Sequence, residues 1–221
     1  MEYSEEIDIV IAGGGICGLA TALALHGKGI KSVILKRSET LRATGLLSIF
    51  LPMGGLGVAS KLRHTALPFQ RIGEARCLQR SNLITALAES LPHGTIRFGC
   101  QVLSVQPDPL TLYPLIQLHN GCVIKAKILI GCDGAHSVVA DFLELKPLKL
   151  FNLWTIRGLT CYPNCHGLPT KSVRFRGENF TVGRVPMDDK LVTGLFRTKD
   201  ILQLLIYIFG PPTTYLIIHV S

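Results

Sequence analysis

The stretch DIVIAGGGICGLATALAL, residues 8–25, decides the fold of this chain. Residues 7–12 are mostly β-branched or apolar, as in a strand that is buried in a parallel sheet. Residues 19–25 are mostly good helix formers and predict a helix that ends near Gly27 or Gly29. The sequence therefore predicts a strand, a glycine-rich turn and a helix in direct succession.

The turn follows the pattern G-x-G-x-x-G, and each of its three glycines has its own physical task. Gly13 permits a tight turn, Gly15 lets the backbone approach a pyrophosphate, and Gly18 allows the helix to pack closely on the strand. The start of the helix adds free N–H groups and the positive end of the helix dipole. Its place between a strand and a helix favours a dinucleotide-binding turn over a chance glycine-rich turn.

The next strand, predicted at residues 32–35, ends in two basic residues. A dinucleotide-binding unit normally has an acidic side chain there, which holds the adenosine ribose hydroxyls. Here the position is Lys36, followed by Arg37. Basic residues at this place also bind the 2'-phosphate of NADP, so these residues alone leave FAD and NADP open. Glu39 can replace the acid only if the loop folds back.

Further strands and helices predict an α/β fold, in which a Rossmann-like parallel sheet is joined by an antiparallel meander. Residues 113–119 and 122–125 flank Asn120-Gly121 and predict a β-hairpin, which we expect in a separate antiparallel layer. The remaining predictions are strands at 74–79, 96–105 and a buried one at 127–131, a helix capped by Ser81 and running to 91, and a helix after Ser137.

Two domains are expected in the 221 residues. Residues 1–145 form the Rossmann-like, dinucleotide-binding domain, with a shortened insertion near 50–75. Residues 146–221 hold the strands of a partial β-rich domain and an unrelated-looking C-terminal tail. The apolar run at 201–209 is shorter than the roughly 20 residues that a membrane-spanning helix needs, so no membrane span is expected.

The composition excludes several other classes of protein. The net charge of +8 arises from 23 Lys and Arg against 15 Asp and Glu, and the basic residues are scattered, so we expect no nucleic-acid partner. Seven cysteines without a visible signal or transit peptide indicate a reducing compartment and a cytoplasmic protein. Cys161, Cys165 and His166 lack a second ligand pair at suitable spacing, so no metal is expected.

Four stretches together resemble one enzyme family: residues 8–25, GEARCLQRSNLITALAESLP (73–92), GTIRFGCQVLSV (94–105) and KAKILIGCDGAHSVVADFL (125–143). The chain resembles the N-terminal portion of a plant FAD-dependent monooxygenase of the aromatic-ring hydroxylase type, similar to salicylate hydroxylase. The resemblance implies FAD as the bound cofactor, NAD(P)H as a transient co-substrate, and O2 and a small aromatic molecule as the other reactants. It also implies that residues 1–145 are the FAD-binding domain and that residues 146–221 belong to a partial substrate-side domain.

The resemblance also assigns contacts to cofactor atoms. Gly13, Gly15 and Gly18 take the FAD pyrophosphate, and Arg42 and Arg80 match arginines that reach the flavin cofactor. Surface solvation is the alternative for both arginines.

Two further positions carry family motifs. Val102 lies where the family backbone passes the adenine, and Asp133-Gly134 matches a motif close to both FAD and the nicotinamide cofactor. For Asp133, capping of the following helix is an alternative that does not exclude the first role. The catalytic residue is unknown, because neither His136 nor Cys17 has a visible orienting partner.

Three features depart from the family pattern. Lys36 replaces the acid, the segment around residues 50–75 is compact, and no Gly-Asp pair occurs in the 221 residues, although a later Gly-Asp motif contacts the ribityl chain in the family. We therefore expect a truncated member of low activity. An NADP-binding reductase-like domain and a non-catalytic FAD-binding remnant are the alternatives, and Asp133-Gly134 favours FAD.

Overall fold

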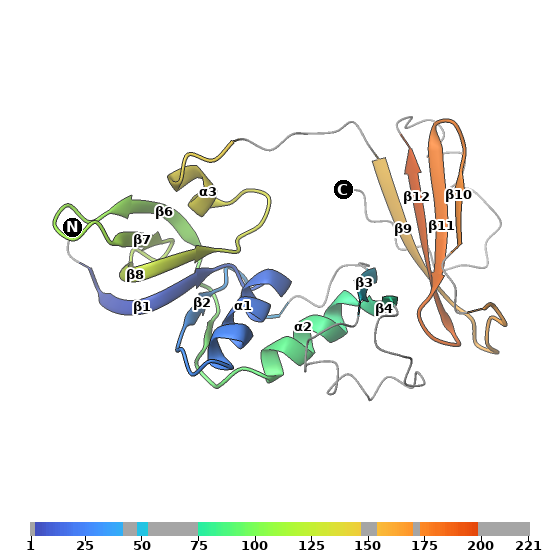
Figure 1. Cartoon of the computed structure of the whole chain (residues 1–221), viewed down its shortest axis with the longest axis horizontal. Coiled ribbons are helices and arrows are strands. Elements are labelled where there is room, and N and C mark those ends of the chain that lie inside the picture. The colour runs from blue at the N-terminus through green and yellow to red at the C-terminus, as the bar shows by residue number, and fades with distance from the viewer. Residues whose placement is uncertain (1–2, 42–47, 53–74, 147–153, 170–172, 199–221) are drawn as a thin grey trace. The chain divides into compact units, whose positions relative to one another are not determined.

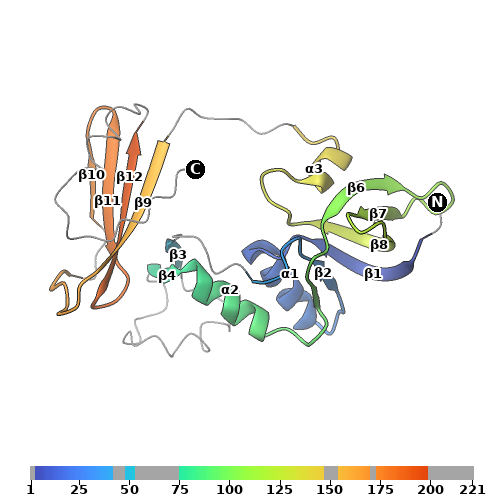
Figure 2. The same cartoon turned by 180° about the vertical axis from the view of Figure 1, so that it is seen from behind.

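The computed structural model describes residues 3–41, 48–52, 75–146, 154–169 and 173–198. The chain divides into two compact units, Met1–Arg42 with Leu83–Leu148, and Ala43–Asn82 with Lys149–Ser221. Figures 1 and 2 show the secondary structure of both units from opposite sides. The domain boundaries expected from the sequence stay predictions.

The described elements follow one another as β1 (Glu5–Ala12), α1 (Ile16–His26), β2 (Val33–Leu35), β3 (Ser48–Pro52), β4 (Ala75–Gln79), α2 (Arg80–Glu89), β5 (Ile96–Arg97), β6 (Val102–Pro107), β7 (Pro114–Leu118), β8 (Val123–Gly131), α3 (Val138–Phe142), β9 (Trp154–Cys161), β10 (Val173–Arg176), β11 (Phe180–Pro186) and β12 (Leu191–Thr198).

The first unit is built on a six-stranded sheet with the order β5-β2-β1-β8-β7-β6. β1 pairs in parallel with β2 on one side and β8 on the other, and β5 extends the parallel part. β7 and β6 continue the sheet in antiparallel pairing. The mixed α/β fold is confirmed, and the strand predicted at 7–12 is central in it. One buried cluster supports the sheet and consists of Val10, Leu35, Ile116, Leu118, Ile124 and Ala126.

The prediction of a separate antiparallel layer for the hairpin is wrong. β7 and the start of β8 form the hairpin, but β8 runs on to Gly131 and pairs with β1 along its length. A strand has two hydrogen-bonding edges, and β8 uses one for β7 and the other for β1. The predicted strands 122–125 and 127–131 are therefore one strand, and its second half is not buried, since Ile128 is 52% exposed.

Two other local predictions need correction. The strand predicted at 96–105 is divided into β5 and β6, because Gly99 adopts a positive φ of 66° and interrupts the extended backbone. The backbone N–H of Cys100 then donates to the carbonyl oxygen of Lys36 at 2.9 Å. Ser81 is not the N-cap of its helix, since α2 already begins at Arg80.

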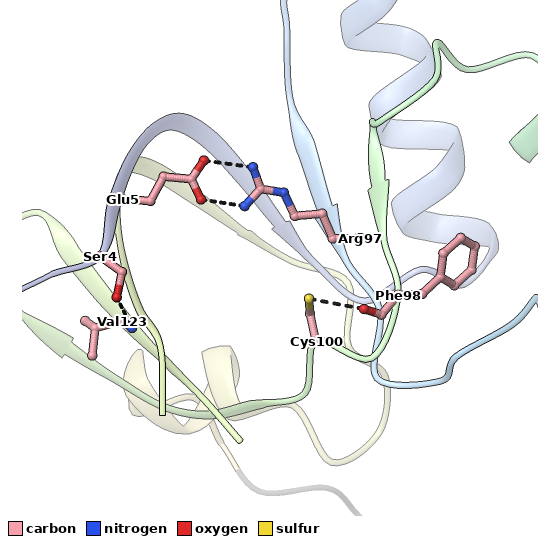
Figure 3. Close-up of polar contacts among 6 residues, drawn as sticks. All are labelled: Ser4, Glu5, Arg97, Phe98, Cys100 and Val123. Carbon is pink, nitrogen blue, oxygen red and sulfur yellow. Dashed lines mark hydrogen bonds and ion pairs between the residues drawn. The ribbon is translucent and has the colours of Figure 1, made fainter. Parts of the chain in front are cut away.

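The start of β1 is held by side chains as well as by strand pairing (Figure 3). Both guanidinium NH groups of Arg97 donate to the carboxylate of Glu5, at 2.5 and 2.8 Å. Because β2 pairs only with residues 10–12 of β1, the first half of β1 is open to Arg97 on this side. The hydrogen bonds from Arg97 hold the pKa of Glu5 below its usual range.

The second unit is rich in strands, as predicted. β3 pairs with β4, and a four-stranded antiparallel sheet has the order β10-β11-β12-β9. Ile156 and Phe196 are buried in this sheet, and Val182 packs against them. In the part of the chain that the structure describes, no helix is long and apolar enough to cross a membrane.

Candidate functional site

Three parallel strands of the first unit end side by side, and the conspicuous sequence motifs follow directly from these ends. Gly13 follows β1, Lys36 follows β2 and Cys132 follows β8. The N–H of Gly13 donates to the carbonyl oxygen of Leu35 at 2.8 Å. The N–H of Cys132 donates to the carbonyl oxygen of Ala12 at 2.7 Å. Ligands of open α/β sheets bind at the carboxyl ends of the strands, where the connections turn to opposite sides. β1 is such a position, since β2 and β8 flank it.

The close packing at this edge requires glycine at two positions. Gly13 has a φ of 102°, and a Cβ atom on it would lie 2.3 Å from the carbonyl oxygen of Cys132. A Cβ atom on Gly18 would lie 1.9 Å from the carbonyl oxygen of Gly13. Side chains at either position would force backbone atoms apart. The turn and packing tasks predicted for these glycines are therefore seen in the structure.

Gly15 is different, because the space around it is open. A Cβ atom there would have no heavy atom within 4 Å outside its own neighbours. Gly15 is the N-cap residue of α1, and within the described residues no side chain caps this end of the helix. The first N–H groups of a helix need acceptors, and a phosphate is a suitable one. The turn therefore fits the pyrophosphate of a dinucleotide.

The side chain of Lys36 lies along the glycine turn. Its Nζ donates to the carbonyl oxygen of Gly14 at 3.1 Å, and a Cβ atom on Gly14 would lie 2.9 Å from Cδ of Lys36. Lys36 is half-buried, whereas Arg37 is exposed. The ammonium thus occupies the side of the turn where dinucleotide-binding units carry their acid.

The loop after Lys36 folds against the segment between β5 and β6. The N–H of Gly99 donates to the carbonyl oxygen of Ser38 at 3.3 Å. A Cβ atom on Gly99 would lie 2.6 Å from Oε1 of Glu39, so this carboxylate faces the chain just before Val102. The sequence left open whether the loop folds back, and the structure brings Glu39 to the segment that leads into β6.

Asp133 connects the end of β8 with the start of α3. Its Oδ1 accepts a hydrogen bond from the hydroxyl of Ser137, and its Oδ2 accepts one from the N–H of Val138 at 2.8 Å. Ser137 itself accepts from the N–H of Ala140 at 3.0 Å and is the N-cap residue. Asp133 thus shares the capping of α3. It also lies beside the glycine turn, since a Cβ atom added to Gly13 would lie 2.7 Å from Cα of Asp133.

For the other predicted site residues in the described part of the chain, the structure gives a position in the fold but no hydrogen bond to the glycine turn. Gly134 is exposed and has a φ of 93°, and Val102 begins β6 with its side chain packed against the core. Arg80 is the first residue of α2, and its relation to the glycine turn stays a prediction. Arg42 lies outside the described residues.

One pair of residues at this edge was missed in the sequence. The Sγ atoms of Cys17 and Cys132 lie 3.4 Å apart, although Cys17 had no visible partner in the sequence. Burial raises the pKa of Cys132 to about 11, with a smaller contribution from its contact with Cys17. The available signal was that each cysteine lies in a motif at the end of one of two parallel strands.

Comparisons with known proteins agree with this geometry. Residues 8–105 match the family described as FAD binding domain. Monooxygenase 1 from Arabidopsis thaliana is 44% identical over 211 residues, which cover 85% of this chain and 53% of the relative. Monooxygenase 2 from the same plant is 36% identical over 218 residues, which cover 87% and 53%. The chain thus spans about half the length of these relatives.

A solved structure shows the same fold. PqsL, a probable FAD-dependent monooxygenase from Pseudomonas aeruginosa, aligns with a TM-score of 0.67 at 15% identity, over 91% of this chain and 63% of PqsL. FAD is the cofactor for which the matched domain is named, and the open glycine turn fits it. With its FAD binding domain and its two plant relatives, this chain is similar to the N-terminal portion of FAD-dependent monooxygenases.

Proposed function

We propose that the edge formed by the ends of β1, β2 and β8 binds FAD, and that the protein uses NAD(P)H and O2 to hydroxylate a small aromatic molecule. One observation carries the proposal. The glycine turn leaves open space at Gly15 before an uncapped helix, while Gly13 and Gly18 pack against backbone. An uncapped helix start of this kind receives an anionic group through backbone N–H donors.

Residues around the turn have complementary roles in this proposal. Gly13, Gly15 and Gly18 form the turn that receives the pyrophosphate, and the first N–H groups of α1 are the donors. The backbone near Val102 runs beside the adenine. Glu39, whose carboxylate faces Gly99, is placed to accept from a ribose hydroxyl in place of the acid that Lys36 replaces.

The flavin end of the cofactor involves other residues. Arg42 and Arg80 reach the cofactor in this proposal, since a planar guanidinium suits phosphate oxygens. Asp133-Gly134 lies near the flavin and the incoming nicotinamide. The hydrogen bonds from Ser137 and Val138 fix the Asp133 carboxylate and thereby the backbone of this motif.

When bound, FAD would supply the redox chemistry, that is, the transfer of reducing equivalents from NAD(P)H to O2. The task of the polypeptide is to bind the cofactor, to orient it and to exclude water. This division of labour explains why the candidate site is built mainly from a glycine turn and backbone donors. For a protein that consists of these 221 residues alone, we expect weak FAD binding and slow NAD(P)H oxidation that yields mostly peroxide, since the chain has no Gly-Asp pair.

The test starts with the purified protein. It should be yellow or turn yellow with added FAD, and FAD should raise its melting temperature more than NADPH does. A colourless protein that only NADPH stabilises would replace FAD by NADP in this site, and stabilisation by neither would refute dinucleotide binding. NADPH consumption, peroxide and product are then measured with a panel of phenolic acids. Product formed in proportion to NADPH would contradict the expected low activity of this chain.

A further inference from the structure

Cys17 and Cys132 bring two thiols together at the edge of the glycine turn. Their Sγ atoms are 3.4 Å apart, although the residues are separated by 115 positions in the sequence. Cys17 lies in the first turn of α1 and is exposed, and Cys132 follows β8 and is half-buried. Thr21 is also near, with its Oγ1 4.0 Å from Sγ of Cys132. Neither thiol has a task in the proposed binding of FAD.

The backbone around both cysteines is closely packed. A Cβ atom on Gly18 would lie 3.4 Å from Cβ of Cys132, so the first turn of α1 lies against the end of β8. The two sulfurs of a disulfide are about 2.05 Å apart. Formation of the bond therefore requires the sulfurs to approach by about 1.3 Å, which side-chain rotation and a small shift of the helix start can provide.

We propose that Cys17 and Cys132 form an oxidative modification site, at which hydrogen peroxide converts the two thiols into a disulfide across the glycine turn, and that this disulfide weakens FAD binding. The disulfide stands on the contact between the two sulfurs alone. Its effect on FAD rests on the proposed function. The oxidant is small and needs access to only one of the two thiols.

The exposed and the half-buried thiol have different roles in the reaction. Sγ of Cys17 attacks one peroxide oxygen, the O–O bond breaks, and Cys17 becomes a sulfenic acid while the first water leaves. Sγ of Cys132 then displaces the hydroxyl group from Cys17, so that the S–S bond forms and the second water leaves. The two thiols lose two electrons and two protons, and peroxide is reduced to two waters. Burial raises the pKa of Cys132 and makes it the less reactive thiol, so the exposed Cys17 reacts with peroxide first.

A disulfide at this place alters the turn that receives the pyrophosphate. Cys17 belongs to the first turn of α1, whose backbone N–H donors directly follow Gly15, where the space is open. The new bond draws this turn towards β8 and changes the direction of these donors. Disulfides in reducing compartments are mostly transient, so a thiol reductant should reverse the change.

Peptide mapping tests the modification site without reference to FAD. The reduced protein is treated with hydrogen peroxide, its remaining thiols are alkylated, and it is digested with trypsin. The peptides 1–28 and 128–149 each contain a single cysteine, Cys17 and Cys132. We expect these two peptides joined and lighter by two hydrogens, with the other cysteines mostly alkylated. Recovery of both peptides in alkylated form after peroxide treatment would overturn the proposal.

Variants separate this pair from general oxidation. Cys17→Ser and Cys132→Ser should each abolish the joined peptide, whereas Cys122→Ser, a change in the turn between β7 and β8, should leave it unchanged. The wild-type map decides the question even if one of the variants does not fold.

FAD titration, followed by flavin fluorescence, tests the second half of the proposal. The dissociation constant of oxidised wild-type protein should be at least several-fold higher than that of reduced protein, and a thiol reductant should restore it. Cys17→Ser should show the same constant before and after peroxide. Equal constants for the joined and the reduced wild-type protein would refute the effect on FAD while leaving the disulfide standing. A reduced protein that binds no FAD would refute the proposed function and this effect together, and the peptide map would still decide the disulfide.

Discussion

Lys36 donates a hydrogen bond from Nζ to the carbonyl oxygen of Gly14 at 3.1 Å. The contact joins the end of β2 to the glycine turn that follows β1. It shows what the basic residue does at a position where an acid is usual. The side chain lies across the turn, and its aliphatic part is packed close to Gly14.

The first prediction concerns the exchange of this lysine for an acid. Lys36→Glu should tighten FAD binding by about tenfold or more, because a charge-assisted hydrogen bond to a ribose hydroxyl contributes about 1.5–3 kcal/mol. NADPH affinity should stay nearly unchanged. Lys36→Met is the matched control, since it removes the ammonium without adding an acceptor. If both variants bind FAD more weakly than wild type, Lys36 contacts the cofactor productively and its predicted role is reversed.

The second prediction compares two glycines of the same turn. Gly18→Ala should lower the free energy of unfolding by about 1–3 kcal/mol, because its Cβ meets the Gly13 carbonyl oxygen at 1.9 Å. Gly15→Ala has open space and should cost less, about 0.5–1 kcal/mol, because Ala is a poorer N-cap residue than Gly. It should nevertheless weaken FAD binding at least about tenfold, since the methyl group enters the space proposed for the pyrophosphate. Urea denaturation and FAD titration measure the two effects, and unchanged FAD affinity in Gly15→Ala would place the pyrophosphate elsewhere.

The third prediction concerns the cap of α3. Asp133→Ala should destabilise the protein by about 1–3 kcal/mol, because it leaves the N–H of Val138 without its carboxylate acceptor. Ser137→Ala should cost about 1 kcal/mol as the loss of an N-cap. The double variant should lose less stability than the sum of the losses in the two single variants, since the Ser137 hydroxyl donates to Asp133. Additive losses in urea denaturation would show that the two side chains act independently.

The fourth prediction concerns acid stability and the ion pair between Asp108 and Lys125. The carboxylate of Asp108 also accepts from the N–H of Leu110 and the hydroxyl of Thr111, at 3.1 and 2.7 Å. The hydrogen bond from Lys125, followed by these two, holds the pKa of Asp108 well below its usual range.

A lowered folded-state pKa means that the folded protein binds fewer protons than the unfolded chain. The stabilisation is therefore present above the unfolded pKa of about 4 and is lost as the pH falls through the lower folded pKa. Asp108→Asn should be less stable than wild type at pH 7, and the difference should shrink below about pH 4. Asp8→Asn, in the exposed pair with Lys127, should change stability little at any pH. A difference for Asp108→Asn that is the same at pH 7 and pH 3 would contradict this assignment.

The sequence by itself determined the parts of the fold that are encoded locally. The strand β1, the glycine turn and α1 are adjacent in the chain, and the need for glycine at positions 13 and 18 follows from backbone geometry that the motif encodes. The hairpin turn at Asn120-Gly121 was predictable for the same reason. The cap of α3 was also visible, since Asp133 and Ser137 lie within one turn of chain.

Only the tertiary structure decided which distant segments meet. Local patterns do not state which edge of a strand receives which partner, and so the hairpin was expected in a layer of its own although β8 pairs with β1. The contact of Lys36 with Gly14 and that of Cys17 with Cys132 span 22 and 115 positions. Both depend on the parallel order β2-β1-β8, which places the ends of three strands at one edge. Strand order arises from the packing of the whole sheet, because burial of apolar side chains is non-directional and acts between residues of any separation in sequence.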